Sequence, residues 1–226
     1  MNFSLILPIY NEERNIDSAV SLLLQNFPET ELILVNDGST DATASILEKY
    51  AKTAKVINYA RNMGKGYAIK QGVLAATTDY IIFCDADIPF GINGIKQLVE
   101  KLEINPGLDI VITEKIKPTE SFVYHLAKQI VRKIIFLLTG LKFNDTQAGL
   151  KGFKKEVAKK IFSHSFINRF AIDIEILYLA KKFQYSVGTI SMPVTENYMR
   201  SSKFTMKEGW YLFKDIFKIY FHHYNV

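Results

Sequence analysis

The carboxylates Asp85 and Asp87 follow directly after the apolar run 80–84 and are separated by one small residue. This spacing places two acidic side chains where a buried strand ends in a loop, which is where open α/β sheets bind ligands. Two such carboxylates can hold one hard divalent cation against the phosphates of a nucleotide. A solvated turn after a strand has the same pattern, so the interpretation depends on the residues that accompany the pair.

Two further predicted strands end beside acidic residues. Segment 3–10 leads to Glu12, and segment 31–36 leads to Asp37. Parallel strands end along the same edge of a sheet, so acids that are distant in sequence can converge there. We therefore expect Glu12, Asp37 and the Asp85/Asp87 pair to line one cleft.

The period of the apolar residues predicts the elements that position these side chains. Strands are expected near 3–10, 31–36, 55–59, 80–84 and 109–113, and helices near 13–26, 41–54, 65–76 and 91–104. Alternating strands and helices favour a parallel sheet, and 226 residues suit one large α/β domain.

The net charge of +5 and the isoelectric point of about 9.0 favour an anionic partner. Nucleotide diphosphate, lipid phosphate and an anionic membrane all satisfy this, as does a plain solvated surface. Nucleic acid is disfavoured because the chain has no basic recognition helix and no aromatic RNA-binding motif.

The single cysteine, Cys84, is expected to be a small buried side chain and excludes an intramolecular disulfide. The N-terminus lacks signal-peptide features, which predicts a cytoplasmic protein.

The segment 62–68 contains two glycines before a predicted helix. It has neither the spacing of a Walker loop nor that of the dinucleotide fingerprint. Two interpretations stay open, namely close backbone packing at the helix start and contact with a nucleotide.

Two later segments, 119–143 and 205–224, predict amphipathic helices with an apolar stripe and a basic edge. Their uncharged runs are too short to span a bilayer. They are either core helices that cover the sheet or helices that dock peripherally on an anionic membrane surface, the second being rich in aromatic residues such as Trp210.

Five segments occur in a fixed order, namely LPIYNEE, VNDGSTDAT, RNMGKGYA, FCDADIPF and DTQAGLKGF. Together they resemble the family 2 inverting glycosyltransferases of GT-A fold, and within them the polyprenyl-phosphate (dolichyl-phosphate) glucosyltransferases and mannosyltransferases. The resemblance implies a single Rossmann-like α/β domain with a mostly parallel central sheet flanked by helices. It places the catalytic domain at 1–204, with 119–143 on the acceptor and membrane side, and a C-terminal amphipathic helix at 205–226.

The resemblance also implies roles for particular residues. Asp85 and Asp87 are expected to bind Mg²⁺ or Mn²⁺, and Asp85 also the nucleotide. The remaining residues expected to contact the nucleotide sugar are Pro8, Tyr10, Glu12, Asp37, Lys65, Lys115, Arg200 and Lys203. For Arg200 and Lys203, contact with the acceptor phosphate is the alternative. Pro89 stands where mannosyl-type relatives usually have Gln, which leaves the third metal ligand open and favours the glucosyl type.

Two carboxylates are predicted on the acceptor side. Asp145 is a candidate for positioning the nucleophile or accepting a proton, with a turn or N-cap carboxylate as the alternative. Asp173 is expected to orient the sugar or a basic residue. A lipid phosphate is already an anion at neutral pH, so such an acceptor requires no strong general base.

The expected activity is transfer of a hexose from a nucleotide sugar, UDP-glucose before GDP-mannose, to a polyprenyl phosphate. One alternative is a soluble transferase that acts on a sugar or protein hydroxyl and needs a base such as Asp145. Another is a non-catalytic nucleotide-binding protein at the membrane periphery.

Overall fold

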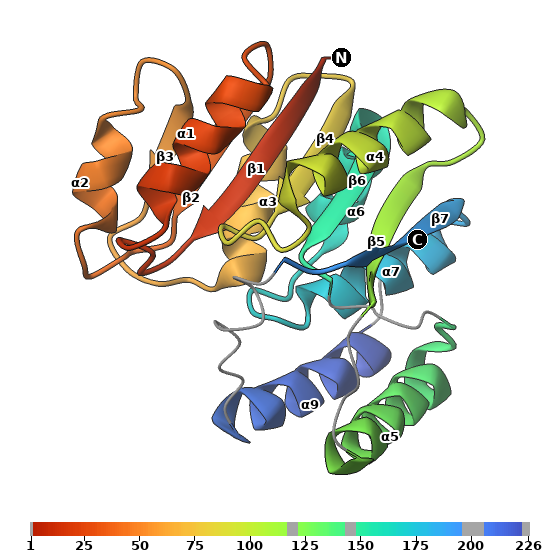
Figure 1. The fold of residues 1–226 in the computed structure, drawn as a ribbon. Helices are drawn as coiled ribbons and strands as arrows, with labels where there is room; N and C mark the ends of the chain where they lie inside the picture. The colour runs from red at the N-terminus through yellow and green to blue at the C-terminus, as the bar shows by residue number, and fades with distance from the viewer. Residues whose placement is uncertain (1, 117–121, 143–147, 196–205, 223–226) are drawn as a thin grey trace.

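Seven strands form one sheet in the order β3-β2-β1-β4-β6-β5-β7 (Figure 1). The computed structural model describes residues 2–116, 122–142, 148–195 and 206–222. The strands are β1 (Phe3–Ile9), β2 (Glu31–Asn36), β3 (Lys55–Asn58), β4 (Tyr80–Cys84), β5 (Ile110–Ile116), β6 (Leu150–Lys154) and β7 (Val187–Pro193). All paired neighbours are parallel except β6, which is antiparallel to both β4 and β5.

Helices cover both faces of this sheet (Figure 1). Their bounds are α1 (Ile16–Asn26), α2 (Thr43–Glu48), α3 (Lys65–Ala75), α4 (Gly91–Ile104), α5 (Phe122–Thr139), α6 (Lys155–His164), α7 (Ile172–Lys182) and α9 (Met206–Phe221). Helices α1, α2 and α4 contribute to one buried apolar cluster, and α3, α6 and α7 contribute to the other.

The pleat of β1 explains why both faces are apolar. Leu5 and Leu7 pack into the cluster with α1, whereas Ile6 points to the cluster with α3. Successive side chains of a strand alternate between the faces, so a strand covered on both sides reads as a continuous apolar run.

The predicted α/β class and mostly parallel sheet are confirmed. The helix expected at 41–54 is shorter, because the chain after Glu48 continues in turns with i to i+3 hydrogen bonds such as Ala51 N to Glu48 O. The sequence pattern assigned neither β6 and β7 nor α6 and α7.

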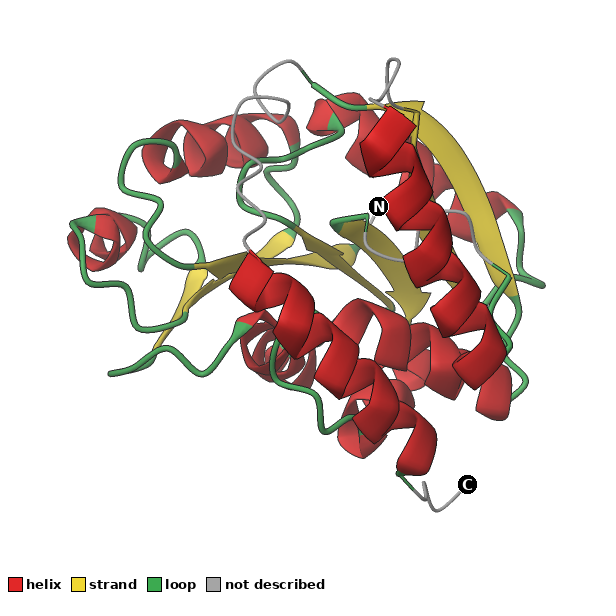
Figure 2. Ribbon diagram, turned by 90° about the horizontal axis from the view of Figure 1, so that it is seen from below, coloured by secondary structure: helices red, strands yellow, loops and turns green. Residues whose placement is uncertain are grey.

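Helices α5 and α9 contact each other at one end of the molecule (Figure 1). From below, α9 lies across the molecule in front of the sheet, just before the C-terminus (Figure 2). Its residues Leu212, Ile216 and Ile219 belong to the α3/α6/α7 cluster, so one face of α9 is core. Its other face exposes Phe213 and Phe221.

Within the described ranges, the helices are too short or too polar for a membrane span.

Candidate active site

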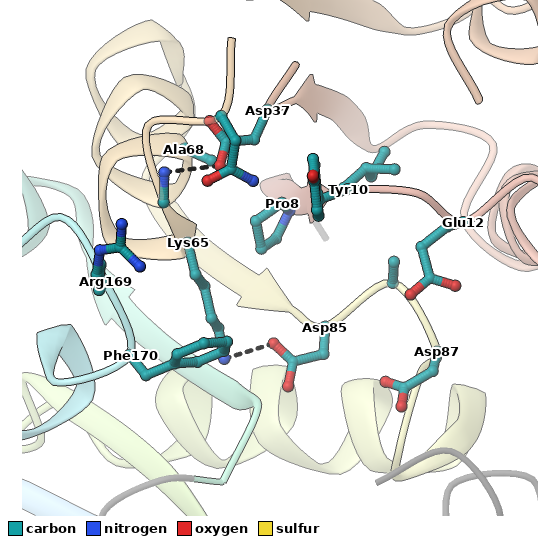
Figure 3. Close-up of a pocket in the computed structure, with 14 residues that line it drawn as sticks. Pro8, Tyr10, Glu12, Asp37, Lys65, Ala68, Asp85, Asp87, Arg169 and Phe170 are labelled. Atoms are coloured by element: carbon teal, nitrogen blue, oxygen red, sulfur yellow. Dashed lines mark hydrogen bonds and ion pairs between the residues drawn. The ribbon is translucent and has the colours of Figure 1, made fainter. Parts of the chain in front are cut away.

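A pocket of about 620 Å³ lies at the carboxyl ends of β1, β2 and β4 (Figure 3). This volume is in the range of small-molecule sites. Its lining residues are Pro8, Ile9, Tyr10, Glu12, Asp37, Asn62, Gly64, Lys65, Ala68, Asp85, Ala86, Asp87, Arg169 and Phe170. The predicted convergence of three acidic strand ends on one cleft is confirmed.

Two wall residues come from the end of β1. Tyr10 is 45% exposed, which leaves its ring available to a bound planar group. Burial raises the pKa of Glu12, and the nearby charges of Asp41 and Asp85 act in the same direction, whereas a hydrogen bond from Asn15 opposes them. The negative charges on this side of the pocket favour binding of a cation close to them.

Asp37 binds the loop that directly precedes α3. Its two carboxylate oxygens accept hydrogen bonds of 2.8 Å from the backbone N–H groups of Met63 and Gly64. Burial raises the pKa of Asp37, and these two hydrogen bonds counteract that effect. Asp37 thus fixes the loop that leads to Lys65.

The glycines of segment 62–68 allow α3 to approach a second loop. A Cβ atom on Gly64, which has φ of +105°, would collide with the carbonyl of Asn168, and one on Gly66 would collide with that of Ile167. The N–H of Tyr67 donates to the Asn168 carbonyl at 3.2 Å. Close packing is therefore observed here, and Gly64 and Lys65 also line the pocket.

This second loop, residues 165–170, brings Arg169 and Phe170 to the pocket. Its backbone is held by the buried Glu175, which accepts hydrogen bonds of 3.0 Å from the N–H groups of Phe166 and Ile167. Neither Arg169 nor Phe170 was predicted as a site residue. Their position depends on tertiary packing against α3, and the sequence signals for it are the glycines of 62–68 together with Glu175.

A chain of alternating charges runs from the pocket into the core. Lys65 Nζ lies 2.7 Å from Asp85 Oδ1 and 3.6 Å from Asp173 Oδ2. Lys151 Nζ lies 2.5 Å from Asp173 Oδ1 and donates a 2.6 Å hydrogen bond to the Ala148 carbonyl. Asp173 therefore stands between two lysines, and Lys65 links it to Asp85.

Burial on its own would raise the pKa of Asp173, but the charges of Lys151, Lys65 and Lys115 hold it below its ordinary value. Burial acts to lower the pKa of Lys65, yet Asp85 and Asp173 raise it overall. Asp173 is thus an anion and Lys65 a cation at neutral pH. A carboxylate with a lowered pKa is a weak general base.

Asp85 is positioned by its backbone as well as by Lys65. Its N–H donates a 2.8 Å hydrogen bond to the Gly149 carbonyl, at the start of β6. A Cβ atom at residue 149 would collide with the Asp85 carboxylate, so a larger residue would displace this carboxylate from its position. This contact explains the first glycine of the segment DTQAGLKGF, Gly149.

The chemistry of Asp85 and Asp87 suits a hard divalent cation, because both carboxylates line the pocket. Mg²⁺ commonly binds one or two carboxylates and completes its octahedron with phosphate and water. Within the described part of the chain, no cluster of three or more potential side-chain ligands occurs. Substrate phosphates and water can supply further ligands to such a cation.

Two of the other predicted site residues, Lys115 and Asp173, lie outside the pocket lining. The positive charge of Lys115 nevertheless helps to lower the pKa of Asp173. Asp145, Arg200 and Lys203 fall outside the described residues, so their roles stay predictions.

Comparison with known proteins matches residues 4–162 to the model of glycosyl transferase family 2. Dolichyl-phosphate beta-glucosyltransferase of Dictyostelium discoideum is 30% identical over 217 residues, which cover 85% of this chain and 66% of that protein. The enzyme of the same name from Drosophila melanogaster is 29% identical, over 97% of this chain and 74% of that protein. This chain thus spans about two thirds to three quarters of these relatives.

Solved structures share the fold at low identity. Glucosyl-3-phosphoglycerate synthase from Mycobacterium tuberculosis, in complex with phosphoglyceric acid, superposes with a TM-score of 0.75 at 19% identity, covering 97% of this chain and 80% of that one. Its complex with Mn²⁺ and UDP-glucose gives 0.72 at 19% identity, over 96% and 77% of the two chains. The family match over most of the chain and the shared GT-A fold agree: this chain belongs to glycosyl transferase family 2 and is a glycosyltransferase.

Proposed function

We propose that this glycosyltransferase moves glucose from UDP-glucose to a polyprenyl phosphate, with inversion at the anomeric carbon and with Mg²⁺ or Mn²⁺. The observation that carries the proposal is the pocket at the strand ends, where Asp85 lies beside Lys65 and Asp87 lies across from Arg169. The names of the relatives support glucose and a dolichyl-type acceptor. The UDP-glucose and Mn²⁺ bound by a protein of the same fold support the donor and the cation.

The proposed reaction is a single displacement. An oxygen of the acceptor phosphate forms a bond to the anomeric carbon while the bond from that carbon to the β-phosphate oxygen of the donor breaks. The electron pair leaves with the diphosphate, which gains negative charge. The nucleophile is already an anion, so no side chain has to remove a proton from it.

The residues of the chain have three tasks in this scheme. Pro8, Tyr10, Glu12 and Asp37 form the wall around the base and ribose, and Asp85 and Asp87 would hold the cation. A divalent cation bound there would neutralise the negative charge that develops on the departing diphosphate. Lys65 keeps the Asp85 carboxylate in place through its 2.7 Å ion pair.

A donor panel tests this function directly. With a polyprenyl phosphate in detergent and Mg²⁺, label from UDP-glucose should enter the lipid phase faster than label from GDP-mannose. Faster transfer from GDP-mannose would assign a mannosyl donor. Label that enters only water-soluble sugar or protein acceptors would favour the hydroxyl-directed transferase.

Docking on an anionic membrane surface would bring this pocket to a lipid-borne acceptor. The adjacent helices α5 and α9 support this part of the proposal, since their outer surfaces combine apolar and basic side chains. The exposed residues are Phe136, Leu137, Phe213, Tyr220 and Phe221, with Arg132, Lys133, Lys214 and Lys218 among them. Apolar residues can enter the headgroup boundary while cations meet anionic lipid.

Replacing Phe136 and Leu137 together by Ser should reduce co-sedimentation with anionic liposomes at least about tenfold, because the lost apolar contact is worth more than 1.4 kcal/mol. These side chains are 46% and 77% exposed, so the melting temperature should change little. Ile104→Ser, which removes a 69% exposed side chain from the end of α4, is the matched control and should bind like the unmodified protein. Failure of the unmodified protein to bind anionic liposomes at low salt would contradict the membrane proposal.

A further inference from the structure

Arg169 is presented at the pocket by a loop that the fold holds from several sides. Besides the contacts of Glu175, Lys70 Nζ donates a 2.7 Å hydrogen bond to the Ser165 carbonyl, and α3 packs on Ile167 and Asn168 through its glycines. Figure 3 shows Arg169 and Phe170 on the side of the pocket opposite Tyr10 and Glu12. A guanidinium carried on such a fixed backbone loses little backbone freedom when it binds a ligand.

The guanidinium of Arg169 also rests on an aromatic ring. Its Cζ lies 4.9 Å from the centroid of the Tyr211 ring, on α9. A cation over the face of an aromatic ring is attracted by the ring quadrupole, and the contact limits the orientations that the guanidinium can take. Helix α9 is itself anchored in the core through Leu212 and Ile216.

The charges around the pocket define what Arg169 can bind. Among the described residues that line the pocket, four are acidic, namely Glu12, Asp37, Asp85 and Asp87, and two are cations, Lys65 and Arg169. Lys65 is already paired with Asp85 at 2.7 Å. Arg169 lies on the opposite side of the pocket from Glu12 (Figure 3), and its planar fork matches two oxygens of a phosphate.

We propose that Arg169 is a phosphate-binding residue of this pocket and that the ring of Tyr211 holds its guanidinium in position. The proposal rests on the proposed function, since a donor diphosphate and an acceptor phosphate are the phosphates that this reaction brings together. It adds a residue and a supporting helix to that site, and it links the phosphate contact to α9.

Binding without turnover separates this proposal from the function. Titration calorimetry with UDP, and separately with uridine, in the presence of Mg²⁺ should show that Arg169→Met weakens UDP binding at least about tenfold and leaves uridine binding unchanged. Arg169→Lys should recover only part of the loss, because an ammonium lacks the bidentate fork. Lys160→Met is the matched control, since its Nζ also lies over a ring, 4.4 Å from that of Phe183, outside the described pocket lining.

The acceptor is tested by the same variants. If UDP binding is normal but the KM for a short polyprenyl phosphate rises about tenfold in Arg169→Met, the phosphate in question belongs to the acceptor, and the proposal stands. Unchanged UDP affinity together with an unchanged acceptor KM would overturn it. Absence of UDP binding to the unmodified protein would instead count against the proposed function.

The ring is tested by two substitutions at one position. Tyr211→Leu should weaken binding of the ligand that Arg169→Met affects, UDP or the acceptor, but only by a few fold. Tyr211→Phe keeps the ring and should bind this ligand normally. In the presence of Arg169→Met, Tyr211→Leu should cause no further loss. An equal effect of Tyr211→Leu with and without Arg169 would show that the ring supports the fold and not the guanidinium.

Discussion

Asp87→Asn is expected to lower the rate of transfer at least about a hundredfold in saturating Mg²⁺ and donor. The amide keeps the shape of the side chain but removes the negative charge that holds the cation against the departing diphosphate. Asp87 lines the pocket on the loop between β4 and α4, so this charge lies where the cation is needed. Initial rates of label transfer to lipid measure the effect.

A second measurement links this loss to the metal. The affinity of the protein for Mn²⁺ in the presence of UDP, followed by electron paramagnetic resonance, should fall with the rate. Asp17→Asn, an exposed change on α1 whose side chain pairs with Lys49 at 3.7 Å, is the control and should alter neither quantity. Near-normal turnover of Asp87→Asn would contradict the assignment of Asp87 as a metal ligand.

The sequence was sufficient to predict where the acidic residues converge. The expectation needed only the period of the apolar runs and the rule that parallel strands end at one edge. Glu12, Asp37 and Asp85 lie within a few residues of their strand ends, so small errors in the strand boundaries did not matter.

The other side of the pocket could not be derived in this way. Arg169 lies far along the chain from the strand ends, and its position results from packing of the 165–170 loop on α3. Strand β6 was missed because LKGFK is short and carries two lysines. Its second residue, Lys151, is fully buried, and this arrangement depends on Asp173 of α7, which an apolar pattern does not indicate.

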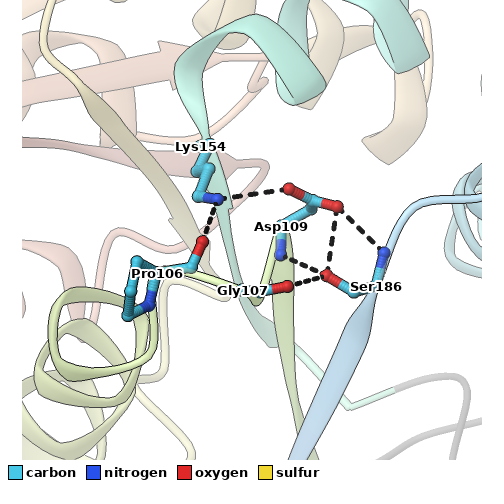
Figure 4. A network of polar contacts seen from close by, with 5 residues as sticks. All are labelled: Pro106, Gly107, Asp109, Lys154 and Ser186. Atoms are coloured by element: carbon cyan, nitrogen blue, oxygen red, sulfur yellow. Dashed lines mark hydrogen bonds and ion pairs between the residues drawn. The ribbon is translucent and has the colours of Figure 1, made fainter.

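A charged cluster at a strand end does not by itself indicate a site. Asp109, just before β5, accepts hydrogen bonds of 3.0 Å from the N–H and hydroxyl groups of Ser186, and its other oxygen lies 3.2 Å from Lys154 Nζ (Figure 4). Because β5 runs in the same direction as β4, this network lies at the opposite edge of the sheet from Asp85. It joins the ends of β5, β6 and β7 and lies outside the lining of the pocket that contains Asp85. Position relative to the carboxyl edge thus separates structural acids from candidate functional ones.

The buried pair of Lys151 and Asp173 should have a large effect on stability. Lys151→Met is expected to lower the free energy of unfolding by about 3 kcal/mol, because it leaves a buried carboxylate without its nearest cation. Asp173 is only 2% exposed and keeps the longer, 3.6 Å contact to Lys65. Urea unfolding at pH 7 measures the difference. Lys49→Met, which breaks the exposed pair with Asp17, should cost less than about 1 kcal/mol.

Two further measurements show whether charge is the cause of this loss. The double variant Lys151→Met/Asp173→Asn should be more stable than Lys151→Met alone, since it buries no uncompensated charge.

The loss of stability in Lys151→Met should also shrink as the pH falls below about 4. In the unmodified protein the pKa of Asp173 lies below its ordinary value, so the stabilisation from the pair is present above the unfolded pKa of about 3.9 and is lost as the pH falls through the folded pKa. In the variant, protonation instead relieves the penalty of the buried carboxylate. A deficit that is constant with pH and unchanged in the double variant would assign the loss to packing, and Asp173 would then no longer be needed as an anion to hold Lys65 beside Asp85.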